Sequence, residues 1–342
     1  MAIPPLLAEL LRAPGPPGGE AAVTAIVRRE AEALGAEVEG DVLGSTVARV
    51  RGTGHGRLLA LVAHVDQVGV GVTAVDEDGR ARVGALGSWS AADAVGRRFR
   101  VLSGTGEVPA IAVRVGTEGE PAWSDVRLDL GTGDAAATAS LVHPGDAAVV
   151  EGAPLELAGG RVASAALDDR LGVFASLEAL RRLSAAPATW DVALVASVQE
   201  EGPARGGAMA AVTRLRPEVA VVVECTYASD APSGPEPWGD VPLGGGPAVF
   251  RGPIVHPAVA DGLAEAARAC GRPAGVETGT ETWSDADEVF VVGGGVATGL
   301  LSIPVRHMHT ASEIAQLSDV EAAVDVLEAY ARSLPGDASF VR

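Results

Sequence analysis

The amino-acid sequence predicts an α/β fold: a mixed sheet covered by helices on both faces, with a small β domain inserted in the chain. Near-continuous apolar segments at 57–66 and 191–198 are typical of buried strands, and segments with helical spacing alternate with such strands. From about residue 69 to 157 the pattern changes to short valine-rich runs broken by glycine. This change indicates the inserted domain.

The first elements follow in order along the chain. Residues 21–36 carry helical spacing and end at Gly35, which is typical of a helix C-terminal cap. The buried strand at 57–66 comes next, and the inserted domain follows it. Inside that domain Asp78 and Gly79 form a hairpin signal.

Beyond the insertion, strands and helices alternate. The segments concerned are a helix at 172–183 and strands at 191–198, 218–224 and 296–304. A final helix is predicted from Ser318, where Ser318 and Glu321 match a capping box and four apolar residues share one face, namely Val320, Val324, Leu327 and Tyr330. The Gly-Pro-rich residues 231–247 indicate a surface loop or the rim of a site.

Length and composition set limits on function. With 342 residues, 47% of them hydrophobic, the chain is long enough for two domains, which we place at 1–68 with 158–342 and at 69–157. The net charge of -19 disfavours nucleic acid and anionic membranes as partners. The sequence has no membrane-length apolar run and no basic segment before its first apolar residues, so we expect a cytoplasmic protein.

Residue usage excludes several chemistries. The sequence contains no lysine, which removes Schiff-base chemistry, pyridoxal phosphate and the P-loop lysine. Its two cysteines, Cys225 and Cys270, are too few for a disulfide framework or a zinc knuckle, and we interpret them as core thiols.

Polar clusters follow the predicted strands at their C-terminal ends, where open α/β sheets bind ligands. Four clusters lie at strand ends and a fifth precedes a helix: His64/Asp66, Glu200/Glu201, Glu224, His307/His309, and Asp168/Asp169. Each alone has an ordinary structural explanation, such as a histidine that satisfies core polar groups, a helix N-cap or a solvated strand end. His307 and His309 could form a strand with both rings on one face. Asp285, Asp287 and Glu288 indicate a solvated face, with the lining of a pocket as the alternative. The five clusters together favour a two-metal site.

Charge counting supports this hypothesis. Asp168, Glu201 and Glu224 would bring three negative charges into one pocket, and without cations these would repel and raise one another's pKa. Two divalent ions would supply the balancing charge and lower the pKa of water from about 15.7 toward about 7. Mixed histidine and carboxylate ligands suit Zn, Co or Mn better than Mg or Ca.

Four motifs, in this order and spacing, carry a family resemblance: "AHVDQVG", "ALDDRLG", "VQEEGPARGG" and "RHMHTASE". The sequence resembles the tetrahedral (TET) and glutamyl aminopeptidases, family forty-two of the metallopeptidases. Weaker similarity extends over nearly the whole chain, at "GPPGGE", "DVLGST", "HPGD" and "SDA". The resemblance implies a zinc-peptidase-like α/β unit whose insert, residues 69–157, is a β-barrel that mediates dimerisation. It also implies a homo-oligomer, a dimer or a dodecamer built from dimers.

The resemblance further implies roles for individual residues. His64 would bind one metal with Asp66 as its orienting partner, and Asp168 would bridge two ions. Glu200 would be the general base on water. The remaining ligands would be Glu201 and His309 for the other metal and Glu224 as a terminal ligand.

Three positions depart from the family pattern. Glu224 replaces an aspartate, His307 replaces a tyrosine-like residue, and Thr310-Ala311 replaces Ser-Pro. We therefore expect a metal-dependent aminopeptidase that acts on short peptides with two divalent ions per chain, zinc first and cobalt or manganese as alternatives. A deacylase or amidohydrolase on small amides, and a catalytically impaired homologue that serves as an assembly subunit, remain as alternatives.

Overall fold

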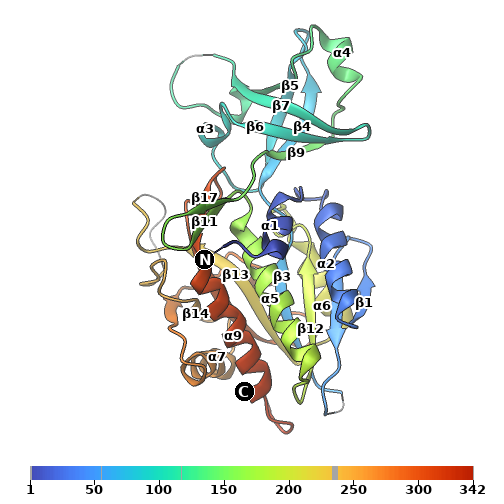
Figure 1. Ribbon diagram of the computed structural model, residues 1–342. Helices are drawn as coiled ribbons and strands as arrows, with labels where there is room; N and C mark the ends of the chain where they lie inside the picture. Colours follow the sequence, from blue (N-terminus) through green and yellow to red (C-terminus); the bar gives the residue numbers. More distant parts are fainter. Residues whose placement is uncertain (1, 55, 117, 233–237, 342) are drawn as a thin grey trace.

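Two sheets organise the chain in the computed structural model, which describes residues 2–341 except 55, 117 and 233–237. Within these residues one sheet is mixed and has eleven strands, and the other is a closed barrel (Figure 1). The helices are α1 Pro5–Arg12, α2 Ala21–Ala33, α3 Ala91–Ala94, α4 Ala135–Ala139, α5 Leu167–Ala185, α6 Gly206–Leu215, α7 Pro257–Ala269, α8 Ala286–Val289 and α9 Leu317–Ser333. The strands of the large sheet are β1 Glu37–Gly40, β2 Thr46–Val50, β3 Leu58–His64, β10 Leu155–Leu157, β11 Arg161–Ser164, β12 Asp191–Ser197, β13 Val219–Tyr227, β14 Ala248–Arg251, β15 Gly275–Thr278, β16 Ala297–Arg306 and β17 Glu313–Gln316.

The centre of the large sheet is parallel. Strands β12, β3, β13 and β16 are hydrogen-bonded neighbours in this order and run in one direction. Every residue of β3 and of β12 is buried, which explains their continuous apolar sequences. Because parallel strands end at one edge, the polar residues that follow them meet there.

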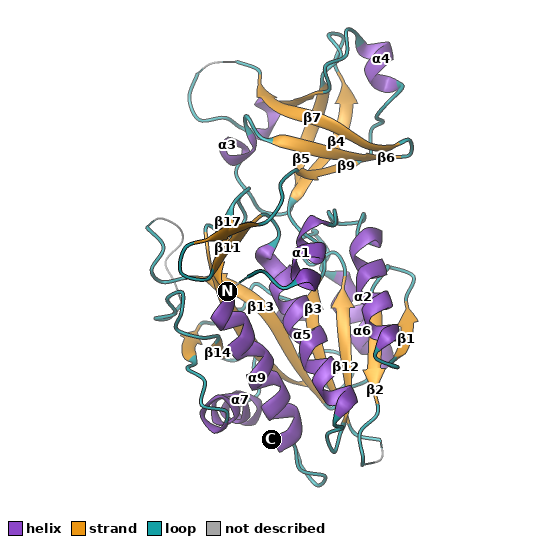
Figure 2. Cartoon of the chain, viewed as in Figure 1, coloured by secondary structure: helices purple, strands orange, loops and turns teal. Residues whose placement is uncertain are grey.

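Helices cover both faces of this sheet, as Figure 2 shows. Helix α5 packs on β3 and β13 and is flanked by α1, α2 and α9 on the same face. On the opposite face α6 packs on β12 and β3, and α8 packs on β16 and α6. The sheet is thus buried on both sides, and its carboxyl edge remains as the place for a site.

The barrel consists of β4 Gly69–Val75, β5 Ala81–Leu86, β6 Arg98–Ser103, β7 Gly106–Arg114, β8 Val126–Asp129 and β9 Ala147–Val150. These strands close in the order β4-β5-β8-β7-β6-β9 and enclose a core of their own, which is separate from the core of the α/β unit. The barrel lies beyond the carboxyl edge of the large sheet (Figure 1). The predicted fold class, a mixed sheet covered on both faces with an inserted β-barrel, is confirmed.

Two local predictions are wrong. Residues 307–309 do not form a strand: β16 ends at Arg306, and His307 and His309 have φ values of 58° and 60°, which place them in a turn. The capping box at Ser318 is not formed, because β17 runs directly into α9 and Gln316 is the N-cap without a side-chain hydrogen bond.

The apolar face predicted for this last helix is nevertheless buried. Among the residues described, no helix combines the length and the hydrophobicity that a membrane crossing requires.

Candidate metal centre

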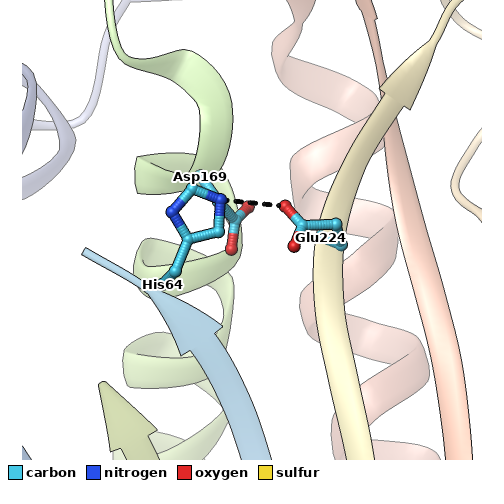
Figure 3. Close-up of side chains that lie close together, drawn as sticks. All are labelled: His64, Asp169 and Glu224. Carbon is cyan, nitrogen blue, oxygen red and sulfur yellow. Dashed lines mark ion pairs between the residues drawn. The ribbon is translucent and has the colours of Figure 1, made fainter. Parts of the chain in front are cut away.

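The ends of two central strands bring a histidine and a glutamate together. His64 is the last residue of β3 and Glu224 lies in β13, and both side chains are buried. The Nε2 atom of His64 lies 3.2 Å from Oε1 of Glu224 (Figure 3). It lies equally close, 3.2 Å, to Oδ1 of Asp168 at the start of α5.

Asp168 joins this pair to a second one. Its other oxygen, Oδ2, lies 3.0 Å from Nε2 of His309. That nitrogen is also 3.1 Å from Oε1 of Glu201. One buried carboxylate therefore stands between two histidine-carboxylate pairs, with one oxygen directed at each imidazole.

Asp66 contacts the turn after β12 more closely than it contacts His64. Its Oδ1 is 3.6 Å from His64 Nδ1, which exceeds hydrogen-bond distance. The same carboxylate accepts the backbone N–H groups of Glu200 at 3.0 Å and Glu201 at 2.9 Å. Asp66 is fully buried, so its charge is stabilised by these two donors. It fixes the turn that carries both glutamates.

Glu200 is buried but has few partners. Its Oε1 accepts no hydrogen bond from the described residues and lies 3.4 Å from Nε of Arg205. Burial raises the pKa of Glu200 well above its usual value. A buried carboxylate next to a cavity, with an oxygen that accepts no hydrogen bond, is available to exchange a proton.

A cavity of about 770 Å³ opens over these residues. Its floor is the carboxyl edge of the sheet, and one wall comes from the barrel, residues 85–88. Aromatic and apolar side chains line another part of the cavity, namely those of Tyr227, Trp238, Trp283 and Met308. The predicted loop at 231–247 thus reaches the cavity at Trp238, and its residues 233–237 lie outside the described part of the chain.

The electrostatics of the cluster favour a bound positive charge. Burial opposes the charged form of His64, but Glu224, Asp168 and Asp66 outweigh burial and raise the pKa of His64 well above its usual value. Burial also raises the pKa of Glu224 to about 7. Bound cations would supply positive charge that otherwise comes from protons on these histidines and carboxylates.

The donor atoms fit divalent metal ions. Among the described residues, three groups have their ligand atoms within 4.8 Å of one another, and one of them, Asp168 with Asp169 and Cys225, contains no histidine. The other two are His64 with Asp169 and Glu224, and Asp168 with Glu201 and His309. Each of these two groups offers one imidazole nitrogen and two carboxylates. Such nitrogen and oxygen donors suit zinc and similar ions, so the residues present fit the metals that the sequence predicts.

Two further residues belong to the site, although neither was assigned a role of its own from the sequence. Asp169 lies beside His64 and Glu224 (Figure 3), and its Oδ1 accepts the backbone N–H of Gly172 at 2.9 Å. Glu313, the last residue of the "RHMHTASE" motif, is 1% exposed. It accepts the backbone N–H groups of Asp168 at 3.2 Å and of His309 at 2.9 Å. Spacing alone does not reveal such a role, because Glu313 acts on backbone groups.

The acidic group Asp285, Asp287 and Glu288 differs from its interpretation as a solvated face. Asp285 does not belong to a solvated face: it is 1% exposed and accepts a hydrogen bond of 2.6 Å from Ser197 Oγ. Asp287 and Glu288 are half-buried. His307 is half-buried too, and its backbone oxygen accepts a hydrogen bond of 2.7 Å from Thr310 Oγ1.

Comparison with known proteins identifies the family to which this chain belongs. The profile described as "M42 glutamyl aminopeptidase" matches residues 44–326, most of the chain. The chain belongs to the M42 peptidase family. Like other M42 peptidases it is a hydrolase of the aminopeptidase class, and the predicted resemblance is confirmed.

Individual M42 relatives agree in sequence and in fold. A lysyl aminopeptidase of Pyrococcus furiosus is 30% identical over 312 residues, which are 87% of this chain and 87% of the relative. The structure of an aminopeptidase from Desulfurococcus kamchatkensis superposes with a TM-score of 0.90 at 27% identity, over 96% of this chain and 94% of that one. The TET1 peptidase of Pyrococcus horikoshii, described as assembling into a tetrahedron or an octahedral shell, gives 0.84 at 26% identity, over 96% and 99%.

Proposed function

We propose that this M42 peptidase is a dinuclear metal-dependent aminopeptidase that removes N-terminal residues from short peptides. Five residues would hold two divalent ions, with zinc expected and cobalt or manganese as alternatives: His64, Asp168, Glu201, Glu224 and His309. The observation that carries the proposal is the Asp168 carboxylate between His64 and His309. Bound ions would polarise the scissile carbonyl and lower the pKa of water.

Glu200 is the proposed general base. Its carboxylate takes a proton from the attacking water and then delivers that proton to the leaving amine. The burial of Glu200 and its position at the cavity support this role. Asp66 accepts hydrogen bonds from the backbone N–H groups of Glu200 and Glu201 and so fixes the turn that carries both residues.

The exchange Glu200→Gln tests the base directly. We expect kcat to fall by at least about 100-fold, the lower range for a lost general base, while metal content stays at the wild-type value. Metal is measured by mass spectrometry and turnover with leucyl and glutamyl reporter substrates. The exposed Glu77 provides the matched control, Glu77→Gln, which should change neither quantity. A Glu200→Gln protein with near-wild-type turnover would refute the role.

Metal removal tests the rest of the site. Dialysis against a chelator should abolish hydrolysis, and zinc or cobalt should restore it at about two ions per chain. One ion or none, with no hydrolysis after reloading, would support the impaired homologue instead, with Glu224 as the position responsible for the lost ion.

The proposed metal positions favour substrates with a free α-amine. Four carboxylates line the cavity, and two divalent ions would offset their charge. The lone pair of a free amine can bind such an ion, whereas the nitrogen of an N-acylated amino acid has its lone pair delocalised into the amide and does not bind a cation. Reporters with a free amine should therefore be cleaved, and their N-acetylated counterparts should not. The opposite result would favour a deacylase.

We further propose the division into a catalytic unit, residues 1–68 and 158–342, and a dimerisation domain, residues 69–157. The assembly described for the Pyrococcus horikoshii relative supports a homo-oligomer for this chain, with a dimer as the building block and a dodecamer as the larger form. Light scattering on the purified chain gives the mass, and a monomer would refute this. The cytoplasmic location stays a prediction.

A further inference from the structure

His309 touches the barrel as well as the catalytic unit. Its Nδ1 lies 2.8 Å from the backbone oxygen of Ser88. A carbonyl oxygen can only accept, so Nδ1 carries a hydrogen and donates it. In the neutral ring the other nitrogen, Nε2, then has a lone pair that can bind a metal cation. This is the nitrogen that faces Asp168 and Glu201.

The same barrel segment also approaches Glu201. Gly87 has a φ of 85°, a conformation that glycine adopts without strain. A Cβ at this position would lie 3.3 Å from Oε2 of Glu201 and 2.8 Å from Cγ1 of Val68. Glycine thus lets the barrel backbone pass close to Glu201, one residue before the Ser88 carbonyl that contacts His309. Glu201 and His309 are the two ligands proposed for one metal position.

The barrel core anchors this segment through Trp89. The indole Nε1 of Trp89 donates to the backbone oxygen of Gly69 at 2.8 Å, where the chain enters the barrel. Its ring packs 5.0 Å from Trp123 and 6.1 Å from Phe99, measured between centroids. Trp123 in turn donates to the backbone oxygen of Trp89 at 3.3 Å. These contacts fix the direction in which the adjacent Ser88 carbonyl points.

We propose that residues 87–89 form a positioning segment through which the barrel controls cation affinity at the His309 position. The Ser88 carbonyl holds the ring of His309 and places its hydrogen on Nδ1, so Nε2 is preorganised for a divalent cation. The ion-pair contacts of His64 are with Asp66, Asp168 and Glu224, all in the α/β unit, so we expect the segment to act on the His64 position far less. The inference rests on the proposed two-metal function.

Two variants and one matched control test the segment. Trp89→Phe keeps an aromatic ring and removes the hydrogen bond to Gly69. Gly87→Ala strains the backbone beside Ser88. The control Trp190→Phe removes an equivalent indole hydrogen bond, 3.0 Å to Pro335 O, from a buried tryptophan of the catalytic unit. Thermal melting by circular dichroism verifies that each variant folds.

The readout is zinc affinity, measured by competition with a chromogenic chelator, and not turnover. The variant His309→Ala identifies which of the two wild-type affinities belongs to that position. We expect Trp89→Phe and Gly87→Ala to weaken the His309 position by about 10- to 100-fold, the range for lost ligand-orienting partners, and to leave the His64 position within about twofold. Trp190→Phe should leave both unchanged.

Two outcomes would overturn the inference, and a third would overturn the two-metal function on which it rests. Folded variants that keep wild-type affinity at the His309 position would show that the segment orients nothing, and equal weakening of both positions would indicate general destabilisation. If Trp89→Phe fails to fold, Gly87→Ala decides alone. A wild-type chain that binds no zinc would overturn the two-metal function itself, whereas wild-type binding with unaffected variants would overturn this inference only.

Discussion

At the scale of single residues, carboxylates do most of the positioning. Asp66 holds the backbone of the turn with Glu200 and Glu201, and Glu313 holds the backbone of Asp168 and His309. Each carboxylate uses its two oxygens on two different backbone groups. The proposed ligands are thus fixed through their main chains, which leaves their side chains free to bind a cation.

The exchange Glu313→Gln should weaken this support. A glutamine has one acceptor oxygen, so one of the two backbone N–H groups loses its partner. We expect zinc affinity to fall by about 10-fold or more and unfolding free energy to fall by about 1 to 3 kcal/mol. Chelator competition and urea unfolding measure the two effects.

Glu277 provides the control for that exchange. It is equally buried, at 1% exposure, and accepts a hydrogen bond from the hydroxyl of Thr226, which can also donate to an amide oxygen. Glu277→Gln should therefore leave zinc affinity near wild type. Equal losses in both variants would show that burial alone, and not the contact to the ligand backbone, explains the effect.

At the scale of elements, α6 determines where the Glu200 turn lies. The helix starts with Gly206 and Gly207 and packs against the end of β12. A Cβ on Gly207 would lie 2.1 Å from the backbone oxygen of Val198, two residues before Glu200. A Cβ on Gly206 would meet nothing closer than 3.8 Å. The "GG" of the sequence motif is therefore asymmetric in its packing.

The two glycines form a matched pair for a stability measurement. Gly206→Ala should be neutral or stabilise by up to about 1 kcal/mol, because alanine favours the helix. Gly207→Ala should destabilise by about 1 to 3 kcal/mol, since α6 must move away from Val198, and it should also lower turnover. Urea unfolding of both variants checks this, and similar values for the two would contradict the packing argument.

The opposite edge of the sheet contributes a pH-dependent term. Burial would raise the pKa of Asp191, but the backbone N–H of Gly52 and the guanidinium of Arg49 outweigh burial and lower the pKa below its usual value. A lowered folded-state pKa adds stability above the unfolded-state pKa of about 3.9, and this stability is lost as the pH falls through the folded-state pKa.

Asp191→Asn should therefore be less stable than wild type at pH 7. The difference should shrink as the pH falls below about 4, because the wild-type carboxylate becomes protonated. Thermal melting of both proteins at pH values between 7 and 3 measures how this stability difference changes. The control Asp261→Asn removes an exposed partner of Arg251 and should have little effect at any pH. A pH-independent difference for Asp191→Asn would argue against the ionic contribution.

Prediction from sequence succeeded where hydrophobic periodicity decides the structure. Strands β3, β12 and β13 were recognisable from their apolar runs, and the polar residues at their ends mark one edge because parallel strands end together. The turn at His307 and His309 was not recognisable from the sequence, because no residue pattern indicates a positive φ at two non-glycine residues. Contacts to backbone atoms, such as those of Glu313 and Ser88, were equally invisible.

At the scale of the whole molecule, two cores share one cavity. The α/β unit and the barrel are packed separately, yet both line the space above the proposed metal positions. Metal binding should therefore stabilise the native chain as a whole. This stabilisation is about 4 kcal/mol for one site when free metal exceeds its Kd about 1,000-fold.

Zinc should thus raise the melting temperature of chelated protein, and His64→Ala combined with His309→Ala should remove the response. Calorimetry at a fixed chain concentration checks this. A double variant that responds like wild type would show that zinc stabilises the chain through other residues.

The closed barrel has a consequence for how such a chain evolves. Within the described residues every barrel strand is paired with a strand on each side, so these strands leave no open sheet edge for another chain to extend. Any association through this barrel must then use surface side chains, among which Ile111 and Val115 are 42% and 44% exposed. Single substitutions can alter side-chain contacts without rebuilding a sheet. Relatives with the same barrel can therefore acquire or lose partners by point mutation while the fold that supports the cavity stays unchanged.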